Sequence, residues 1–225
     1  MELVAYIDLD GTLAVSPISG IIEEAYRQIS LRAGRELGEV KLLSWRIHVE
    51  LIKKSSPLAF DWDYIYEEVS KILQISPSSR IDRRLEELCE FSKVLDDAYR
   101  VLDRLRSTAG VLVLATNGLL KYQKCVIEFL GLDRYFDLVL TPDVAGCLKN
   151  CSKFYSLPST SSRKVVIGDN YTFDVYYPKT FGLKTVYVDR STIDPYVKWL
   201  GIERIIEPDT VINSLEQLPN VISRL

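Results

Sequence analysis

The segment LVAYIDLDGTL, residues 3–13, runs from a strongly apolar stretch into two carboxylates. Its near-continuous Leu, Val, Tyr and Ile predict a strand that is covered on both faces, as in a parallel sheet. Asp8 and Asp10 follow directly where that strand ends. Two like charges so close repel each other unless a cation lies between them, so the pair points to a cation-dependent reaction.

Four further apolar runs have the same character. They are VLVLAT (111–116), FDLVLT (136–141), KVVIGD (164–169) and TVYVD (185–189). Segments with helical patterning separate them, and this alternation predicts an α/β fold with a Rossmann-like open parallel sheet. The pattern of residues 204–218 predicts a last short strand and a closing helix.

Residues 15–94 have a different pattern, in which apolar side chains recur about every 3.6 residues. Glycines and Ser- and Pro-containing stretches break the segment into helices. A stretch of this length is a folded unit and not a loop. We therefore predict an α/β core domain formed by residues 1–14 and 95–225, with an all-helical subdomain at 15–94 inserted after the first strand.

The composition argues against several classes of protein. The 225 residues carry a net charge of −3, without the basic stripe that nucleic-acid binding requires. No apolar run approaches the roughly 20 residues of a membrane-spanning helix. The N-terminus begins with a strand and not with a secretory signal. We therefore expect a cytoplasmic protein that binds neither nucleic acid nor a membrane.

Four cysteines raise the question of a metal site or a disulfide. Cys147 and Cys151 lie four residues apart, but His48 is the only histidine. A zinc site needs further ligands, so zinc is not favoured. Whether Cys147 and Cys151 form a disulfide stays open. Cys89 and Cys125 fall in helical patterns and are predicted to lie in the core.

Aromatic side chains are frequent in the helical segment, and they include Trp45, Trp62, Tyr64 and Tyr66. Aromatic residues at helical spacing usually pack inside a core, so we prefer the interior of the helical segment for these four, with the lining of a pocket as the alternative. His48 is likewise expected to be a buried histidine and not a catalyst.

The polar residues gather where the predicted strands end. They are Asp8 and Asp10 after the first strand, Thr116, Asn117 and Gly118 after the second, and Asp169 and Asp174 after the fourth. In an open parallel sheet these ends meet at one edge, where ligands bind. Carboxylates are the hard oxygen ligands that Mg²⁺ prefers, and hydroxyl and amide donors suit a phosphoryl group. The sequence therefore predicts a Mg²⁺ site beside a phosphate site.

Four short motifs resemble, in this order, those of the haloacid dehalogenase (HAD) superfamily. They are DLDGT (8–12), TNG (116–118), a downstream lysine and GDNYTFD (168–174). The helical segment resembles the cap that many phosphatases of this superfamily carry between the first and second motifs. The resemblance covers almost the whole chain.

The resemblance implies a role for each motif residue. Asp8 is the expected nucleophile, which takes the phosphoryl group as an aspartyl-phosphate. Asp10 is expected to protonate the leaving group and then to activate water. Thr116, Asn117 and Gly118 are expected to bind the oxygens of the transferred group.

The metal and a lysine complete the implied site. Asp169 is expected to bind Mg²⁺ together with Asp8 and Asp10, the latter through its carbonyl, and Asp174 is a further ligand or a support. In GCLKN (146–150) the lysine has the expected offset from the glycine, although the proline that often follows is absent. We therefore prefer Lys149, with Lys153 as the competitor.

The implied reaction is the hydrolysis of a phosphate ester. The dehalogenases of the superfamily lack an aspartate two residues after the nucleophile, whereas this chain has Asp10. We predict a Mg²⁺-dependent phosphatase that acts on a small phosphorylated metabolite of the phosphoglycolate or sugar-phosphate type. The alternatives are a phosphonatase or another hydrolase of the superfamily, and a protein that binds a phosphorylated ligand without turnover.

Overall fold

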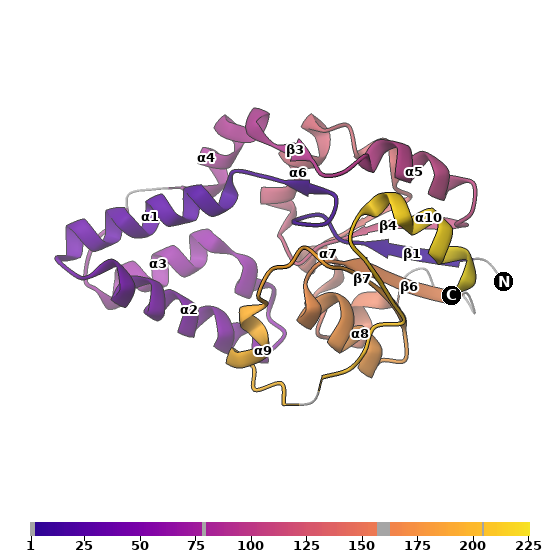
Figure 1. Ribbon diagram of the computed structural model, residues 1–225. Helices are drawn as coiled ribbons and strands as arrows, with labels where there is room; N and C mark the ends of the chain where they lie inside the picture. The colour runs from indigo at the N-terminus through magenta and orange to yellow at the C-terminus, as the bar shows by residue number, and fades with distance from the viewer. Residues whose placement is uncertain (1–2, 78–79, 157–162, 204) are drawn as a thin grey trace.

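The computed structural model describes residues 3–77, 80–156, 163–203 and 205–225. It consists of a sheet flanked by helices and a group of helices beside it (Figure 1). The six strands are all parallel and lie in the order β5 (Leu138–Leu140), β4 (Val111–Ala115), β1 (Leu3–Ile7), β6 (Arg163–Gly168), β7 (Lys184–Val188) and β8 (Thr210–Ile212). The predicted Rossmann-like α/β architecture is therefore confirmed.

Strand β1 lies inside the sheet, which is why its sequence is apolar throughout. Val4 is paired with Val111 on one side and with Lys164 on the other. All five residues of β1 are buried, because alternate side chains enter different cores. Val4 and Tyr6 belong to the core on one face of the sheet, whereas Ala5 and Ile7 belong to the core on the other.

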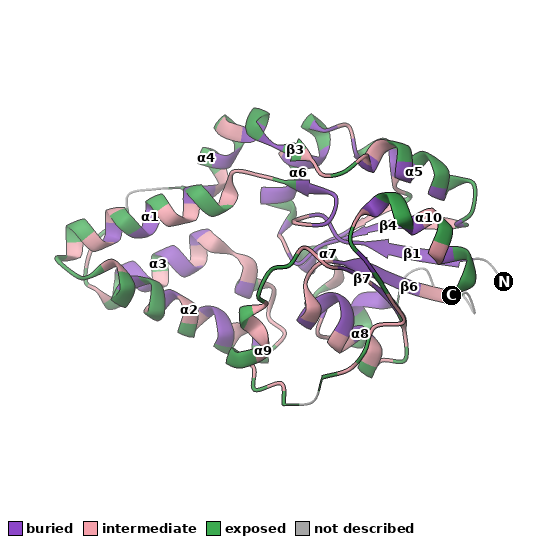
Figure 2. Ribbon diagram, viewed as in Figure 1, coloured by how far each residue is buried: buried purple, intermediate pink, exposed green. Residues whose placement is uncertain are grey.

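Helices cover both faces of the sheet. The core that contains Ile7 is closed by side chains of α5 (Ala98–Arg106), α6 (Leu120–Phe129) and α10 (Leu218–Val221). The opposite core is closed by Phe154 and Tyr155 of the 3₁₀-helix η4 (Ser152–Tyr155). The interior strands are accordingly buried, and the outward faces of the helices are exposed (Figure 2).

The helical segment lies between two short strands that were not predicted. These are β2 (Ala14–Val15) and β3 (Lys93–Val94), which pair antiparallel. Strands of two residues show no periodicity, so the sequence pattern could not reveal them. Between them come α1 (Ile18–Ala33), α2 (Leu37–Lys53), η1 (Pro57–Phe60), α3 (Trp62–Ile72), α4 (Ile81–Leu88) and η2 (Cys89–Phe91). The division of the chain at residues 15 and 94 stays a prediction.

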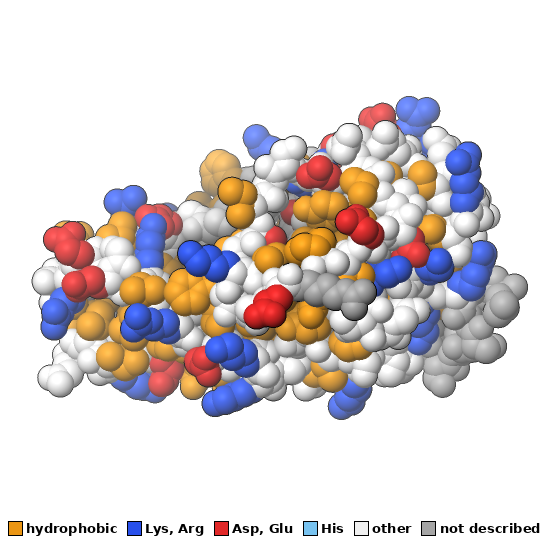
Figure 3. Space-filling model, turned by 60° about the horizontal axis from the view of Figure 1, so that its bottom comes forward, with side chains coloured by type: hydrophobic (Ala, Val, Ile, Leu, Met, Phe, Trp, Pro, Cys, Tyr) orange, Lys and Arg blue, Asp and Glu red, His pale blue; other side chains and the backbone are white. Residues whose placement is uncertain are grey.

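The remaining elements are short, and all but the last two connect strands. They are η3 (Asp133–Tyr135), α7 (Pro142–Ala145), the π-helix η5 (Tyr171–Tyr176), α8 (Tyr177–Thr180), α9 (Pro195–Trp199), η6 (Leu215–Gln217) and η7 (Ile222–Arg224). None of the helices in the described ranges has the length and hydropathy needed to cross a membrane. On the face shown in Figure 3, acidic and basic side chains are interspersed, and hydrophobic side chains gather near its middle.

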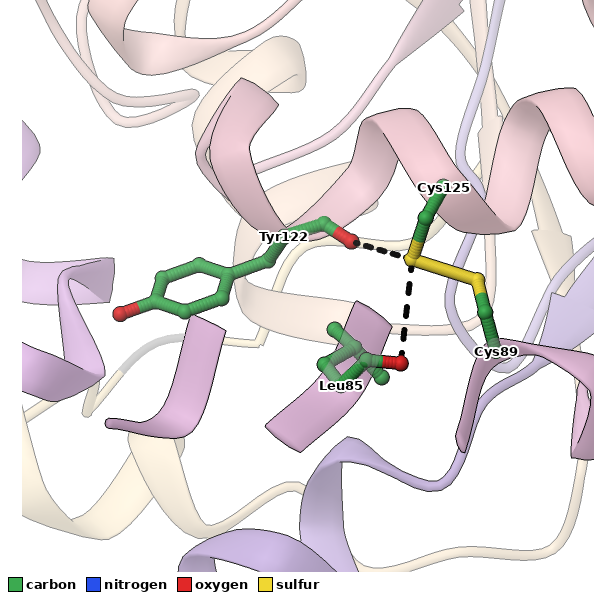
Figure 4. The surroundings of a disulfide bond; sticks show 4 residues. All are labelled: Leu85, Cys89, Tyr122 and Cys125. Atoms are coloured by element: carbon green, nitrogen blue, oxygen red, sulfur yellow. Dashed lines mark hydrogen bonds between the residues drawn. A yellow bond between two sulfur atoms is a disulfide. The ribbon is translucent and has the colours of Figure 1, made fainter. Parts of the chain in front are cut away.

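A disulfide joins the end of the helical segment to the sheet-covering helix α6. Cys89 of η2 and Cys125 of α6 form this bond, with their Cα atoms 6.2 Å apart (Figure 4). Both cysteines lie in or against the core, as expected. Their pairing was not predicted, because the two helical elements pack side by side only in three dimensions. Cys147 and Cys151 are both free thiols.

Candidate active site

The loop after β1 is shaped by a glycine. Asp8 continues the strand, and its backbone N–H donates to the carbonyl of Ile167 at 2.9 Å. Gly11 has a φ of +81°, and a Cβ there would overlap the carboxylate of Asp169. Only glycine therefore allows the first loop and the loop after β6 to approach so closely.

Thr12 links the same two loops through its hydroxyl. Its Oγ1 donates to Asp169 Oδ1 at 3.0 Å and accepts from the Asp169 backbone N–H at 3.0 Å. Thr12 is fully buried, so this pair of hydrogen bonds is protected from water. Sequence reasoning quoted this threonine in DLDGT but assigned it no role.

Lys149 lies at the centre of the site. Its Nζ is 2.5 Å from Asp8 Oδ1 and 2.7 Å from Asp174 Oδ1. Burial by itself would lower the pKa of this ammonium, but Asp174 and Asp8 together raise the pKa above its ordinary value. The side chain is therefore a buried cation. Lys153, its competitor in the sequence, is exposed.

The loop that carries Lys149 is tied to the end of β4. The backbone N–H of Lys149 donates to Asn117 Oδ1 at 3.0 Å, and that of Gly118 donates to Thr116 Oγ1 at 2.9 Å. Thr116 and Asn117 are both buried. The three residues after β4 thus form a turn that Thr116 closes and from which Asn117 holds the lysine loop in place.

Three carboxylates form a cluster that could hold a metal ion. Oxygen atoms of Asp8, Asp169 and Asp174 all lie within 4.8 Å of one another. Burial, with a further contribution from the Asp8 charge, raises the pKa of Asp169 to about 6. Burial also raises the pKa of Asp174 to about 8, against the opposing effect of Lys149. Three acids face one lysine, and such a hard oxygen donor set fits Mg²⁺.

Asp174 is also tied to its own loop. Its Oδ1 accepts from Lys149, and its Oδ2 accepts from the backbone N–H of Asn170 at 3.1 Å. A Cβ at Gly168 would overlap the Asp174 side chain, so the glycine at the end of β6 makes room for it. These contacts support Asp174 as the residue that positions Lys149, whether or not it also contacts a metal.

The side chain of Asp10 has a different environment from the three clustered acids. Its Oδ2 accepts from Gln123 Nε2 at 2.5 Å. Burial and the charge of Asp8 raise the pKa of Asp10 to about 7. Gln123 is a buried residue of α6, and a Cβ at Gly118 would overlap its amide. Sequence reasoning missed Gln123, since a single amide within a helix gives no signal of its own.

The residues predicted from the strand ends line one cavity of about 210 Å³. Asp8, Asp10, the turn 116–118, Lys149 and Asp174 all contribute to its walls. Asp169 lies beside the cavity, in contact with Thr12 and in the carboxylate cluster. The structure therefore brings together every residue that the sequence analysis placed in the site.

The rest of the cavity wall is aromatic and comes from both parts of the chain. Phe60 and Trp62 belong to the helical segment, and Phe173 and Tyr196 belong to the α/β part. Trp62 packs against the core of the helical segment, as preferred from the sequence, and it also lines the cavity, which was the alternative.

His48 is fully buried behind this wall, as predicted. Its Nδ1 is 2.6 Å from the carbonyl of Ala59, and its Nε2 is 3.0 Å from the hydroxyl of Tyr196. A carbonyl only accepts, so Nδ1 carries the proton and Nε2 accepts from the tyrosine. Burial lowers the pKa of His48 to about 4, so the ring is neutral.

Comparison with protein families agrees with this geometry. Residues 4–175 match the family model of the haloacid dehalogenase-like hydrolases. The chain belongs to this family. The matched range covers most of β1, the helical segment and the acidic loop after β6, and it includes the residues that line the cavity apart from Tyr196.

Individual relatives share the fold at low sequence identity. A HAD phosphatase from Thermococcus onnurineus has a TM-score of 0.74 and 24% identity, with 99% of this chain and 98% of that chain covered. The L-2-haloacid dehalogenase from Xanthobacter autotrophicus has a TM-score of 0.65 and 18% identity, with coverage of 99% and 98%. These similarities establish the fold and leave the reaction to the site.

A curated relative aligns with part of this chain. It is the ribulose-1,5-bisphosphate 5-phosphatase of Halopiger xanaduensis, which is 33% identical over 107 residues. The alignment covers 45% of this chain and 45% of the relative. The chain thus matches less than half of that protein.

Proposed function

We propose that this HAD-like hydrolase is a Mg²⁺-dependent phosphatase that cleaves small phosphomonoesters through an aspartyl-phosphate. The observation that carries the proposal is the separation of two acids within one cavity. Asp8 belongs to the carboxylate cluster with Lys149, whereas the carboxylate of Asp10 is turned toward Gln123. This separation supports attack by Asp8 and proton transfer by Asp10.

In the first step a carboxylate oxygen of Asp8 forms a bond to phosphorus, and the bond from phosphorus to the ester oxygen breaks. Asp10 gives its proton to that departing oxygen, which leaves as an alcohol. Lys149 offsets the negative charge that gathers around Asp8 and the transferred group. The hydroxyl of Thr116, whose oxygen accepts from the Gly118 N–H, and the N–H groups of Asn117 donate to the phosphoryl oxygens.

In the second step Asp10, now a carboxylate, takes a proton from a water molecule that attacks the aspartyl-phosphate. The phosphorus–Asp8 bond breaks, phosphate leaves, and both acids return to their starting states. Gln123 holds the Asp10 carboxylate in one orientation through both steps. The same residue therefore acts first as acid and then as base.

Mg²⁺ would be held by Asp8 and Asp169, with the Asp10 carbonyl and Asp174 as further candidate ligands. When bound, it would neutralise charge on the phosphoryl oxygens and lower the repulsion between the clustered acids. The fit rests on the donor set, since three carboxylates converge within 4.8 Å.

The test is release of phosphate from p-nitrophenyl phosphate in Mg²⁺ and in EDTA. Asp8→Asn is the variant, and Asp103→Asn, an exposed aspartate of α5, is its matched control. We expect release that needs both Mg²⁺ and Asp8, with Asp103→Asn unchanged. Equal release by Asp8→Asn would overturn the mechanism. Binding of Mg²⁺ without turnover of any phosphate ester would favour a ligand-binding protein on this fold.

A further inference from the structure

The cavity has two ends of opposite character. The first end, which we call the sheet end, contains the carboxylates, Lys149, Gln123 and the 116–118 turn. The rest of the lining, which we call the aromatic end, consists of the apolar and aromatic side chains of Ile18, Ile22, Phe60, Trp62, Phe173 and Tyr196, together with the uncharged polar residues Ser19, Tyr122 and Asn170. A leaving group attached to the transferred phosphate must occupy this second end.

The aromatic side chains form one continuous, braced wall. The ring of Phe60 lies 5.9 Å from that of Phe173, and Phe173 lies 5.0 Å from Tyr196, both edge to face. His48 supports the wall from behind, with ring centroids 5.0 Å from both Phe60 and Trp62. Because these rings support one another across both parts of the chain, the wall offers fixed apolar surface to a ligand.

The aromatic end offers no positive charge to a second anionic group of the substrate. Among the described residues that line the cavity, Lys149 is the one cationic side chain, and it contacts Asp8 and Asp174. Other cations nearby are engaged away from the cavity. Lys121 contacts Asp61 and Asp63 of the helical segment, and Arg190 donates to the carbonyls of Gly11 and Thr12.

An anionic group at the aromatic end would lose its hydration without gaining a cationic partner. Burying an unpaired charge is strongly unfavourable, whereas an uncharged ring gains from contact with aromatic walls. The volume of about 210 Å³ is below the 300–1,000 Å³ that is typical of sites for drug-sized ligands. The space therefore suits a phosphate and a leaving group of about one ring.

We infer that the substrate is a phosphomonoester of a single-ring, uncharged phenol or alcohol, and that esters with a second anionic group are rejected. This inference rests on the proposed phosphatase function. It excludes as substrates both a bisphosphate, which the name of the Halopiger xanaduensis relative specifies, and phosphoglycolate, which carries a carboxylate. Trp62 and Ile22, on different walls, are the residues assigned to this selection.

The test compares phenyl phosphate with 4-carboxyphenyl phosphate, which differ by one carboxylate at the far side of the ring. We expect kcat/KM for the carboxylated ester to be lower by at least about tenfold. Trp62→Arg is expected to reduce or reverse this preference, because it places a cation in the wall. Trp199→Arg, on the exposed side of α9, is the matched control and should keep it.

A second variant guards against a folding defect in the first. Ile22→Lys introduces a cation from α1, on a different wall, and is expected to shift the preference in the same direction. Equal kcat/KM for the two esters in the unmodified protein would overturn the inference, and so would an unchanged preference in both cationic variants when each is folded.

Binding measurements separate this inference from the proposed function. Calorimetric titration of Asp8→Asn with each ester reports the preference without turnover. Tighter binding of phenyl phosphate supports the inference, even if the unmodified protein hydrolyses neither ester. The absence of hydrolysis would reject the phosphatase function and not the selection. Equal binding together with Asp8-dependent hydrolysis of both esters would leave the phosphatase function standing and would reject the selection.

Discussion

The two ends of the cavity differ in how their residues reach it. At the sheet end, Asp8, Thr116 and Asp169 each follow a strand, and their place is set by the parallel order β4–β1–β6. At the aromatic end, the side chains come from η1, α3, η5 and α9, and their place depends on how helices pack against the sheet.

This difference bears on what each end does. The sheet end holds charges in contact, and removing one leaves the others without compensation. The aromatic end holds neutral rings, so a substitution there changes the fit of the leaving group and leaves the reacting groups in place. Changes at the sheet end should therefore affect every substrate, whereas changes at the aromatic end should alter the ranking among substrates.

The largest effect is expected from Lys149→Met, with Lys153→Met, an exposed lysine of η4, as the matched control. Loss of the buried ammonium leaves Asp8 and Asp174 facing each other, so kcat/KM should fall by about 10³-fold for every ester. Without Mg²⁺ the free energy of unfolding should fall by about 3–5 kcal/mol. Urea unfolding and steady-state kinetics measure both. A similar loss in Lys153→Met would show that the wrong lysine has been placed at the sheet end.

The disulfide connects the two parts of the chain, and breaking it tests whether they need this bond. The double variant Cys89→Ala, Cys125→Ala releases a loop of 36 residues, which should lower the free energy of unfolding by about 4 kcal/mol. The pair Cys147→Ala, Cys151→Ala is the control, since both are free thiols. Chemical denaturation with and without reductant measures the change. Stability that is insensitive to reductant in the unmodified protein would contradict a stabilising disulfide.

His48 gives the aromatic end its own dependence on pH. Its pKa is about 4 in the folded protein and about 6.5 when unfolded. Between these values the unfolded state binds more protons, so stability is lost as pH falls from about 6.5 to about 4. The loss should be roughly 3 kcal/mol, from about 1.4 kcal/mol for each pKa unit. Unfolding curves of the unmodified protein and His48→Gln measure it, and parallel pH profiles would contradict the assignment.

The sheet end could be predicted because strand periodicity and parallel order place residues without knowledge of packing. Asp8 and Asp169 lie far apart in sequence, yet both follow neighbouring strands, β1 and β6. The preference for Lys149 came from its offset after Gly146, and the structure places Lys149 and not Lys153 against Asp8. The catalytic roles of these residues stay predictions.

The aromatic end and the disulfide could not be predicted in the same way. Trp62 has helical spacing whether it faces a core or a cavity, so periodicity alone does not separate the two. Tyr196 and His48 are 148 residues apart, and nothing in either segment indicates that they form a hydrogen bond. Cys89 and Cys125 pair because η2 lies against α6. Such contacts follow from tertiary packing.

Gln123 contacts Asp10 at the sheet end but comes from helix α6. Its substitution tests whether a helix residue takes part in the proton transfer assigned to that end. If it only fills space, Gln123→Leu should affect all esters equally. If it holds Asp10 for proton transfer, kcat/KM should fall by about tenfold for benzyl phosphate, whose leaving oxygen needs a proton, and much less for p-nitrophenyl phosphate. Gln217→Leu, at an exposed position, is the control. An equal loss for both esters would make Gln123 a packing residue. Proton transfer by Asp10 would then have no positioning residue on α6.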